Sequence, residues 1–375
     1  MADTSIATSH GLSVEQWESQ IFAEYLDRLV FAGYMGTDQS SVIMVKENLV
    51  KGPGDTINIG LRGAVDGAGV TGTSTLEGSE EAMNFYNQQV LIDLFRNGVR
   101  IDGVMSSARV AFDLREEAKS ALVDWMAQEV EDLIAVEFSS IDGVAYGSAT
   151  ETQKDQWLDN NEDRVLFGAS TANTDQAGGL GTGGDDHSDS LLTIDATNDI
   201  LTSSQISLAR RLARLANPKI RPMRLEGGVE MYVMFAHPLC FRDLIADTAI
   251  QNAQREVFPR LGDLHPLTGG QAALYWDGVL IVESEKVPLL SAVGASSINV
   301  AVNVLCGAQA FLVAQGGFEN GSRVKMVEQQ FDYDAKSGFA ISSIMGFEKA
   351  RFGTGAAGVS KQHGIVTVYS AAVAD

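Results

Sequence analysis

The sequence predicts an α+β fold, in which one long helix and one long β-ribbon accompany a central unit of alternating strands and helices. Three observations support this class. An uninterrupted amphipathic pattern covers residues 107–138, short runs of β-branched and aromatic residues recur along the chain, and glycine-rich polar segments separate them. The chain has 38 glycines in 375 residues, roughly one in ten against a usual share of about 7 %. Much of it is therefore expected to run through turns and extended loops.

Composition and charge exclude several classes of function. The formal net charge of −22 disfavours a protein that reads DNA sequence, because affinity for DNA comes mostly from cations that displace condensed counterions. A container that holds DNA without adhering to it would carry this sign of charge. No apolar run approaches the eighteen or so residues that cross a bilayer, and the N-terminus lacks a secretory leader pattern. We therefore expect a soluble protein made in a cytoplasm, without a membrane partner.

Residues 13–36 are expected to form an amphipathic helix. Ser13 and Gln16 match a capping box, apolar residues that include Trp17 recur at helical spacing, and Gly36 stands where a helix stop belongs. A helix with a tryptophan on its apolar stripe must pack on something. The sequence leaves open whether that surface belongs to the same chain.

A long hairpin-like arm is expected next. Strands are predicted at 41–46 and 55–62, joined around the turn residues 51–54, and extended structure returns at 85–101. The intervening glycine-, threonine- and serine-rich stretch ends in an acidic group, namely Glu77, Glu80 and Glu81. Because an isolated two-stranded ribbon is marginally stable in water, this arm needs a surface to lie on. A neighbouring subunit is favoured over the arm's own body.

Residues 107–138 carry the strongest helix signal. The pattern contains no Pro or Gly and predicts a rod of roughly 45 Å at 1.5 Å per residue. The expected apolar stripe consists of Ala111, Leu114, Ala118, Leu122, Trp125, Val130 and Leu133. A single helix of this length beside a sheet is a scaffold element, whereas a bundle would show several.

The following segment changes character. In residues 139–200 Gly, Ser, Thr, Asn and Asp dominate, which predicts a surface insertion or a mobile loop. A short helix is predicted at 202–216. Residues 210–224 are basic without an acidic residue, and their cations are Arg210, Arg211, Arg214, Lys219, Arg221 and Arg224. Two interpretations stay open: these cations pair with local carboxylates, or they contact a partner's acidic surface such as the Glu77, Glu80 and Glu81 tip.

The remaining residues predict a compact α/β or α+β unit followed by a sheet. A strand at 229–236, a helix at 238–256, a strand at 272–283 and the apolar run 298–314 alternate along the chain. Three further strands are expected to share one sheet, at 322–331, 338–347 and 364–373.

Motifs for catalytic, cofactor or metal chemistry are weak. Residues 179–184 match the spacing GxGxxG, but a dinucleotide site needs a buried strand before that loop, and here a polar stretch precedes it. Asp185, Asp186, His187 and Asp189 could surround a divalent cation, but EF-hand spacing is missing and a solvated acidic loop is favoured. We therefore predict no cofactor, no metal ion and no enzymatic activity.

Several motifs, in order along the chain, resemble one protein family. Residues 50–103 (VKGPGDTINIG…RNGVRIDG) are similar to the signature of major capsid proteins of N-four-type podoviruses. In that family a KGxGD turn leads to a GxGVxGxxxLEGxEE loop and an ID strand. Further matches lie at 114–118 (LREEA), at 307–310 (GAQA) and along 332–353.

The resemblance implies the Hong Kong 97 capsid fold of tailed bacteriophages. It covers residues 12–140 well and 228–375 more loosely, and the segment between them departs from the family pattern. The implied division of the chain is an N-terminal arm with the amphipathic helix (1–38), an extended loop (39–103), a peripheral domain with the spine helix (104–140 and 316–375), a Gly/Asp-rich insertion (141–200) and an axial domain (201–315).

The same resemblance implies a structural function. Copies of the chain would assemble into the hexamers and pentamers of an icosahedral shell that encloses double-stranded DNA. Expected partners are other copies of the chain, portal and scaffolding proteins, and packaged DNA without sequence specificity, with decoration proteins as an open case. The protein would reside in the virion after assembly in the host cytoplasm. Alternatives are an encapsulin-like compartment shell of the same fold, or a soluble cytoplasmic enzyme that uses the central unit.

Subunit contacts are hypothesised at three places. Polar contacts are assigned to the ribbon tip, and apolar anchors to one tryptophan on the arm and one on the long helix. The cationic stretch is the third candidate. The residues concerned are Glu77, Glu80, Glu81, Trp17, Trp125, Arg210, Arg211 and Arg214.

Overall fold

The computed structural model describes residues 31–49, 56–62, 69–72, 75, 77, 80, 83, 85–102, 109, 113–169, 186–224, 230–253, 273–318, 322–332, 336–353 and 359–373. Most of the helix predicted over 13–36, including Trp17, lies outside these residues. Within them, Ala32–Tyr34 form the 3-10 turn η1 and Met35–Gly36 form strand β1. Because β1 pairs in parallel with the next strand, the predicted helix does not extend to Gly36.

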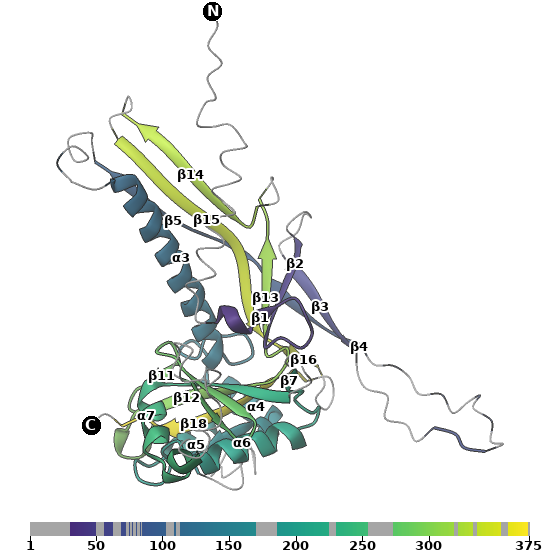
Figure 1. Ribbon diagram of the computed structural model, residues 1–375. Helices are drawn as coiled ribbons and strands as arrows, with labels where there is room; N and C mark the ends of the chain where they lie inside the picture. Colours follow the sequence, from purple (N-terminus) through teal and green to yellow (C-terminus); the bar gives the residue numbers. More distant parts are fainter. Residues whose placement is uncertain are drawn as a thin grey trace, which may run out of the picture.

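The first of two large sheets, which we call the long-strand sheet, occupies one end of the molecule (Figure 1). Its strands are β1, β2 (Ile43–Leu49), β5 (Asp93–Ile101), β13 (Phe311–Gly316), β14 (Val324–Phe331) and β15 (Lys336–Lys349). β15 pairs antiparallel with β14 on one edge and with β5 on the other, and its last residues pair with β13. The strands predicted at 41–46, 322–331 and 338–347 are confirmed, with shifted bounds.

Helix α3 (Leu114–Ser139) packs along the long-strand sheet and shares the first hydrophobic core with it. It begins later than the predicted residue 107, after Asp113, whose carboxylate accepts a hydrogen bond from the backbone N–H of Arg115 at 2.9 Å. Its buried stripe recurs every four residues, at Ala118, Leu122, Met126, Val130, Ile134 and Phe138. Trp125 and Leu133, predicted for this stripe, lie beside it and are only partly buried.

The second sheet, which we call the central sheet, has the order β6–β18–β12–β8–β10–β9, with β11 on β12 and β7 on β8. Its strands are β6 (Val165–Phe167), β7 (Met223–Arg224), β8 (Glu230–Ala236), β9 (Ala273–Trp276), β10 (Val279–Glu283), β11 (Leu289–Leu290), β12 (Val300–Cys306) and β18 (Ile365–Ala371). Around it lie α4 (Glu151–Asn160), α5 (His187–Leu192), α6 (Ser203–Leu215) and α7 (Pro238–Ala246) (Figure 1). The strand predicted at 229–236 and the helix predicted at 202–216 are confirmed.

The apolar run predicted at 298–314 divides between the two sheets. Its first part is β12 in the central sheet, and its second part is β13 in the long-strand sheet. Between them the chain turns at Gln309, which has a positive φ of 58°. Gly307 packs so closely that a Cβ there would lie 2.3 Å from the carbonyl oxygen of Arg221, so only glycine fits this crossing.

The C-terminal strand belongs to a different sheet from the expected one. Residues 364–373 were expected beside 322–331 and 338–347, but β18 lies between β12 and β6 in the central sheet. Every residue of β18 is buried, and two hydrophobic cores cover the two faces of this sheet. A strand that is apolar on both faces fits only such a doubly covered position. Residues 365–371 therefore lie in a different sheet from the other strands of the expected peripheral range, 316–375.

The segment predicted as a surface insertion, 141–200, is built into the fold wherever the structure describes it. Helix α4, strand β6 and helix α5 enclose a third hydrophobic core, in which Trp157 and Phe167 are buried. The prediction is wrong for residues 141–169 and 186–200. A few apolar residues are sufficient here because they cluster on one side of short elements that cover one face of the central sheet.

The strand predicted at 272–283 is a hairpin of β9 and β10. Its turn residues, Asp277 and Gly278, have φ values of 45° and 75°. Positive φ at both positions is typical of a type I′ turn, which Asp-Gly favours. The helix predicted at 238–256 is also interrupted, because α7 ends at Ala246 and Asp247 adopts an extended ψ of 122°.

The predicted β-ribbon is present and projects from the junction of the two sheets (Figure 1). Its strands β3 (Thr56–Arg62) and β4 (Phe85–Leu91) pair antiparallel along their full length. The strand predicted at 41–46 does not join it, since β2 pairs with β1 and β13 instead. A fourth hydrophobic core lies between the base of the ribbon and the long-strand sheet.

Candidate assembly surfaces

The ribbon and the strand that follows it expose large apolar side chains. Phe85 and Leu91 are 69 % and 72 % exposed, and Leu94 and Val99 on β5 are exposed as well. On β4 the exposed residues alternate with inward-facing ones, among them the buried Val90. Phe85 and Leu91 therefore share the outer face of the ribbon. Apolar side chains concentrated on a projecting element indicate a surface that a partner covers.

A buried glutamine attaches the ribbon to the body. The side-chain amide of Gln88 on β4 donates to Glu348 Oε2 at 2.9 Å and to the carbonyl oxygen of Lys349 at 2.7 Å. Its amide oxygen accepts from the backbone N–H of Arg351 at 2.7 Å. Gly346 lets the strands approach, since a Cβ there would lie 1.8 Å from the Leu91 carbonyl oxygen. The direction of the ribbon is therefore set by specific contacts to the end of β15.

The C-terminal end of helix α3 also contacts the end of β15. Lys349 is buried, and its ammonium donates to the Ser140 carbonyl oxygen at 2.8 Å. Burial lowers the pKa of Lys349 to about 8, although nearby Glu137 and Asp142 favour its charged form. Burial raises the pKa of Glu137, against hydrogen bonds from the Ser140 hydroxyl at 2.9 Å and the Lys349 backbone N–H at 3.3 Å.

Arg351 completes this group of polar contacts. Its guanidinium donates to the Asp142 carbonyl oxygen and to Glu348 Oε1, the latter at 2.7 Å. We call Gln88, Glu137, Glu348, Lys349 and Arg351 the junction network. Sequence reasoning missed it, because its members come from three distant segments and no local pattern marks them.

The hypothesised contact residues lie apart within one chain. Glu77 and Glu80 are exposed, whereas Glu81 and Trp17 lie outside the described residues. Trp125 is partly buried against the first core, so it packs on its own sheet.

The cations of α6 differ in their surroundings. Arg210 pairs with Asp277, and Arg224 on β7 pairs with Glu230 at 3.0 Å, so local carboxylates meet these two. Arg214 lies beside Tyr232, where it favours the ionised phenol against the effect of burial, which raises the pKa of Tyr232. Arg211 is exposed and lines a cavity.

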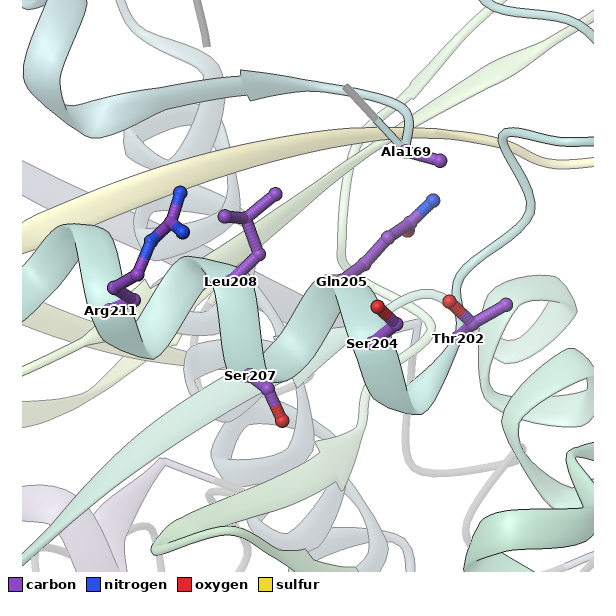
Figure 2. A pocket seen from close by; sticks show the side chains of 7 residues that line it. All are labelled: Ala169, Thr202, Ser204, Gln205, Ser207, Leu208 and Arg211. Carbon is purple, nitrogen blue, oxygen red and sulfur yellow. The ribbon is translucent and has the colours of Figure 1, made fainter. Parts of the chain in front are cut away.

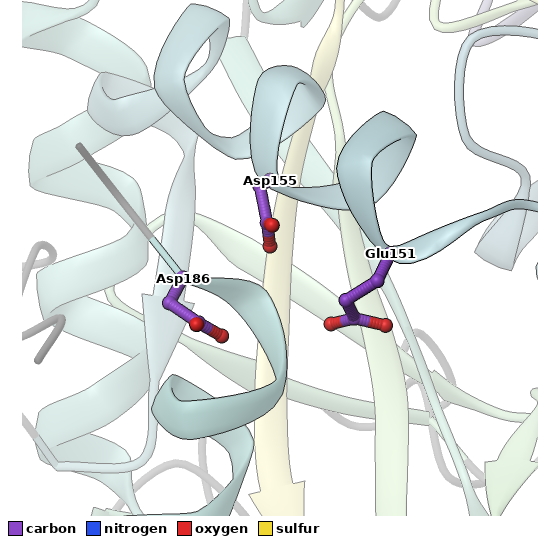
Figure 3. Close-up of side chains that lie close together, drawn as sticks. All are labelled: Glu151, Asp155 and Asp186. Carbon is purple, nitrogen blue, oxygen red and sulfur yellow. The ribbon is translucent and has the colours of Figure 1, made fainter. Parts of the chain in front are cut away.

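Three carboxylates come together near the third core. Oxygens of Glu151, Asp155 and Asp186 lie within 4.8 Å of one another (Figure 3). Asp155 accepts from the backbone N–H of His187 at 2.9 Å, and Asp186 accepts from that of Asp189 at 3.0 Å. Asp155 and Asp186 therefore stabilise the start of helix α5. Lys154, 3.5 Å from Glu151, supplies a nearby positive charge.

The acidic loop predicted from Asp185 to Asp189 is thus partly a helix start. Asp185 lies outside the described residues, as does the GxGxxG match at 179–184. His187 is not a solvated ligand: its ring is buried among aromatic side chains, with Nε2 3.2 Å from the Tyr369 hydroxyl oxygen. Burial lowers its pKa to about 3.

No helix among the described residues is both long enough and apolar enough to span a bilayer.

The chain is similar to phage capsid proteins over nearly its whole length. A family model described as "Phage capsid protein" matches residues 5–374. The "Major capsid protein" of Pseudomonas phage KPP25 is 27 % identical over 368 residues, which cover 95 % of this chain and 94 % of that protein.

Two solved structures show the same architecture. The capsid of cyanophage Pam1 matches with a TM-score of 0.78 and 27 % identity, covering 100 % of both chains. The capsid of Ralstonia phage GP4 matches with a TM-score of 0.73 and 22 % identity, covering 100 % of this chain and 96 % of that chain. The predicted α+β fold of the Hong Kong 97 type is confirmed. The narrower likeness to N-four-type podoviruses stays a prediction. Because the family match spans residues 5–374, the chain belongs to the phage capsid protein family.

Proposed function

We propose that this chain is the major capsid protein of a tailed bacteriophage, whose copies form the hexamers and pentamers of an icosahedral shell. The family match and the capsid relatives support this function. The observation that carries it is the ribbon, which leaves the body and exposes Phe85 and Leu91. An isolated ribbon of this kind gains stability only from a surface that it lies on.

Assembly follows from a contact between unlike surfaces. The ribbon of one subunit lies on the body of the next. When the rotation between neighbouring subunits divides a full circle evenly, such contacts form a closed ring. The junction network fixes the ribbon at its base, which lets every copy present the same geometry. Exposed ion pairs contribute about 0–1 kcal/mol each, so cohesion should come mainly from apolar contacts repeated around the shell.

The two sheets support a revised division of the chain. We infer a peripheral domain made of α3 and the long-strand sheet, and an axial domain made of the central sheet and its helices. The axial domain would then include residues 141–169 and the strand at 365–371, beyond the expected 201–315. Strands β1, β2 and β5 join the peripheral domain through the long-strand sheet, so the extended loop of the expected range 39–103 is reduced to β3, β4 and the residues between them. The rest of residues 1–38 keeps its proposed role as N-terminal arm.

The proposed function also implies further partners and a location in the virion. The shell would enclose double-stranded DNA without sequence contacts, in accord with a net charge of −22. Portal and scaffolding proteins, and decoration proteins where the phage has them, are proposed partners, with assembly in the host cytoplasm and residence in the virion. We infer a structural role without catalysis. An encapsulin-like compartment is not favoured, because the family match is to phage capsid proteins.

Sedimentation and electron microscopy of the chain expressed alone, and then with the scaffolding protein of its phage, test this function. We expect closed particles or rings of capsomer size in at least one of the two preparations. A chain that remains monomeric in both would contradict the proposal.

A further inference from the structure

Helix α6 begins beside a cavity of about 330 Å³ (Figure 2). We call it the α6 pocket and define it by Ala169, Thr202, Ser204, Gln205, Leu208 and Arg211. Sites for small molecules typically measure about 300–1,000 Å³, so this cavity has room for a small ligand. Gln205, Leu208 and Arg211 extend from one face of the helix toward the side on which Ala169 lies (Figure 2). The pocket therefore combines an amide, an apolar side chain and a guanidinium along that face.

The side chain of Gln205 is buried without hydrogen-bond partners. It is only 2 % exposed, and within the described part of the chain neither its Oε1 nor its Nε2 is hydrogen-bonded. Buried polar side chains of folded proteins nearly always have a partner, in the protein or in a bound molecule. A buried amide in the wall of a cavity therefore points to a ligand that offers an acceptor to Nε2 and a donor to Oε1.

The start of α6 favours a negative charge in the pocket. The first turn contains no acidic residue, and Thr202 at the N-cap makes no side-chain capping hydrogen bond. Asp247 Oδ2 accepts from the Ser203 backbone N–H at 2.9 Å, and the next N–H groups of the first turn have no partner within the helix. Such N–H groups, together with the positive end of the helix dipole, attract anions. An anionic ligand therefore fits the first turn of this helix.

The side chains of α6 add positive charge. The helix contains three arginines and no acidic residue, in a chain whose net charge is −22. Arg211 is exposed, and no carboxylate of the described residues pairs with it. The carboxylate of Asp199 is engaged elsewhere, since its two oxygens accept from the backbone N–H groups of Ala169 at 2.7 Å and Asp195 at 2.8 Å. Arg211 is therefore available to an anionic ligand.

We infer that the α6 pocket binds inorganic phosphate, an oxyanion that keeps at least one proton at neutral pH. Its oxygens accept hydrogen bonds from Gln205 Nε2 and from the N–H groups of the first turn, and Arg211 on the same wall balances its charge. Its P–O–H group donates to Gln205 Oε1. The phosphodiesters of DNA have no such proton and would leave Oε1 unpaired, so the pocket selects free phosphate over a nucleic-acid backbone. This site is separate from the contacts proposed for shell assembly.

Equilibrium dialysis of the full-length chain against labelled inorganic phosphate, at neutral pH and constant ionic strength, tests the site. We expect one phosphate per chain, and sulfate should displace it at least tenfold less effectively than unlabelled phosphate, because sulfate has no proton for Gln205 Oε1. Absence of binding, which would leave water alone in the pocket, overturns the inference, as does equal displacement by sulfate. A short DNA duplex is the third competitor. Displacement by DNA at the same phosphate concentration would assign the pocket to a nucleic-acid backbone instead.

Matched substitutions locate the bound phosphate. Gln205→Leu removes the amide but keeps a similar volume, and it should weaken binding at least tenfold and abolish the preference over sulfate. Arg211→Gln should weaken binding at least fivefold but keep that preference, because Gln205 is intact. Arg224→Gln, at an exposed arginine outside the pocket, is the control and should bind within twofold of the wild type.

Equal binding by Arg211→Gln and Arg224→Gln would place the phosphate elsewhere and overturn the inference. If Gln205→Leu does not fold, Arg211→Gln decides the question, because it alters an exposed side chain.

Discussion

Gln88 on the ribbon donates its side-chain amide to the backbone carbonyl oxygen of Lys349 at 2.7 Å, across 261 positions of sequence. Lys349 in turn donates its buried ammonium to the carbonyl oxygen at the end of helix α3. The ribbon, the longest strand and the long helix therefore meet through these two residues. A disturbance at this point should reach the element that we propose to contact the next subunit.

Replacing Gln88 by Ala should loosen the ribbon. The change leaves the Arg351 backbone N–H and a Glu348 carboxylate oxygen without their partner, at a cost of about 1–3 kcal/mol. We expect lower stability in urea unfolding and faster hydrogen exchange of the β3 and β4 amides. Gln89→Ala, at the exposed neighbouring position, is the matched control and should resemble the wild type. Equal behaviour of the two variants would refute a fixing role for Gln88.

The buried Lys349 should make stability depend on pH. Its pKa is lowered by burial from 10.5 to about 8, so between these values the unfolded chain binds more of this proton than the folded chain. The free energy of unfolding should therefore rise with pH in this window through this group, by at most about 1.4 kcal/mol per pH unit. Below pH 8 the full cost of burying the charge is present.

The readout is the difference between wild type and Lys349→Met. Groups with raised pKa values, such as the Tyr146 phenol at about 12, act in the opposite direction but are common to both chains. From pH 8 to pH 10.5 we expect the free energy of unfolding of the wild type to rise relative to that of Lys349→Met. The exposed Lys325→Met is the control and should give no such trend. A difference independent of pH would speak against a charged, buried Lys349.

Polar substitution on the outer face of the ribbon should prevent assembly without unfolding the chain. Phe85→Ser and Leu91→Ser alter highly exposed side chains, so the stability of the single chain should change by about 0.5 kcal/mol or less. The concentration needed for shell formation should rise by an order of magnitude or more, because burial of each side chain at an interface contributes about 1.5–3 kcal/mol. Sedimentation velocity measures both species. Asn87→Ser, an exposed polar position on the same strand, should assemble normally.

Deletion of residues 66–76 should leave a folded protein that forms no shells. The deletion shortens the ribbon tip but leaves both sheets and α3 complete, so circular dichroism and the thermal midpoint should match those of the wild type. Electron microscopy and sedimentation report on assembly. Intact particles from this variant would contradict the proposed role of the ribbon in assembly.

Phe138 should be a determinant of stability for the whole chain. Its ring lies 5.5 Å from Phe235, 5.6 Å from Phe31 and 5.2 Å from Phe311, between centroids, so it joins α3 to both sheets. Phe138→Ala should lower the free energy of unfolding by about 3–5 kcal/mol. Val136→Ala, an exposed position on the same helix, should change it little. Similar losses in the two variants would show that Phe138 has no special place in the core.

Local patterns in the sequence predicted several elements well. The apolar repeat of α3, the alternation in β15 and the ribbon around its glycine-rich stretch all depend on neighbours within a few residues. Helix starts were less certain, since α3 begins only at its Asp113 cap. The acidic group Glu77, Glu80 and Glu81 was identified from sequence, but its contact with another copy stays a prediction, because a contact between copies leaves no periodic trace in one chain.

Long-range pairing explains the predictions that were wrong. The run 298–314 is apolar throughout, and nothing local shows that one half pairs with β8 and β18 and the other with β2 and β15. Residues 365–371 look like any buried strand, and only their register with Val300–Cys306 assigns them to the central sheet. The polar segment 141–200 concealed a core element, since Trp157 and Phe167 are too few to produce a periodic signal.

The sequence by itself therefore determined the long helix with its apolar side, the ribbon and most of the strands. Only the tertiary structure decided which elements meet and how Gln88 and Lys349 fix the ribbon. The physical reason is that helix and strand patterns arise from backbone periodicity, whereas sheet partners and buried polar contacts arise from burial that joins residues hundreds of positions apart.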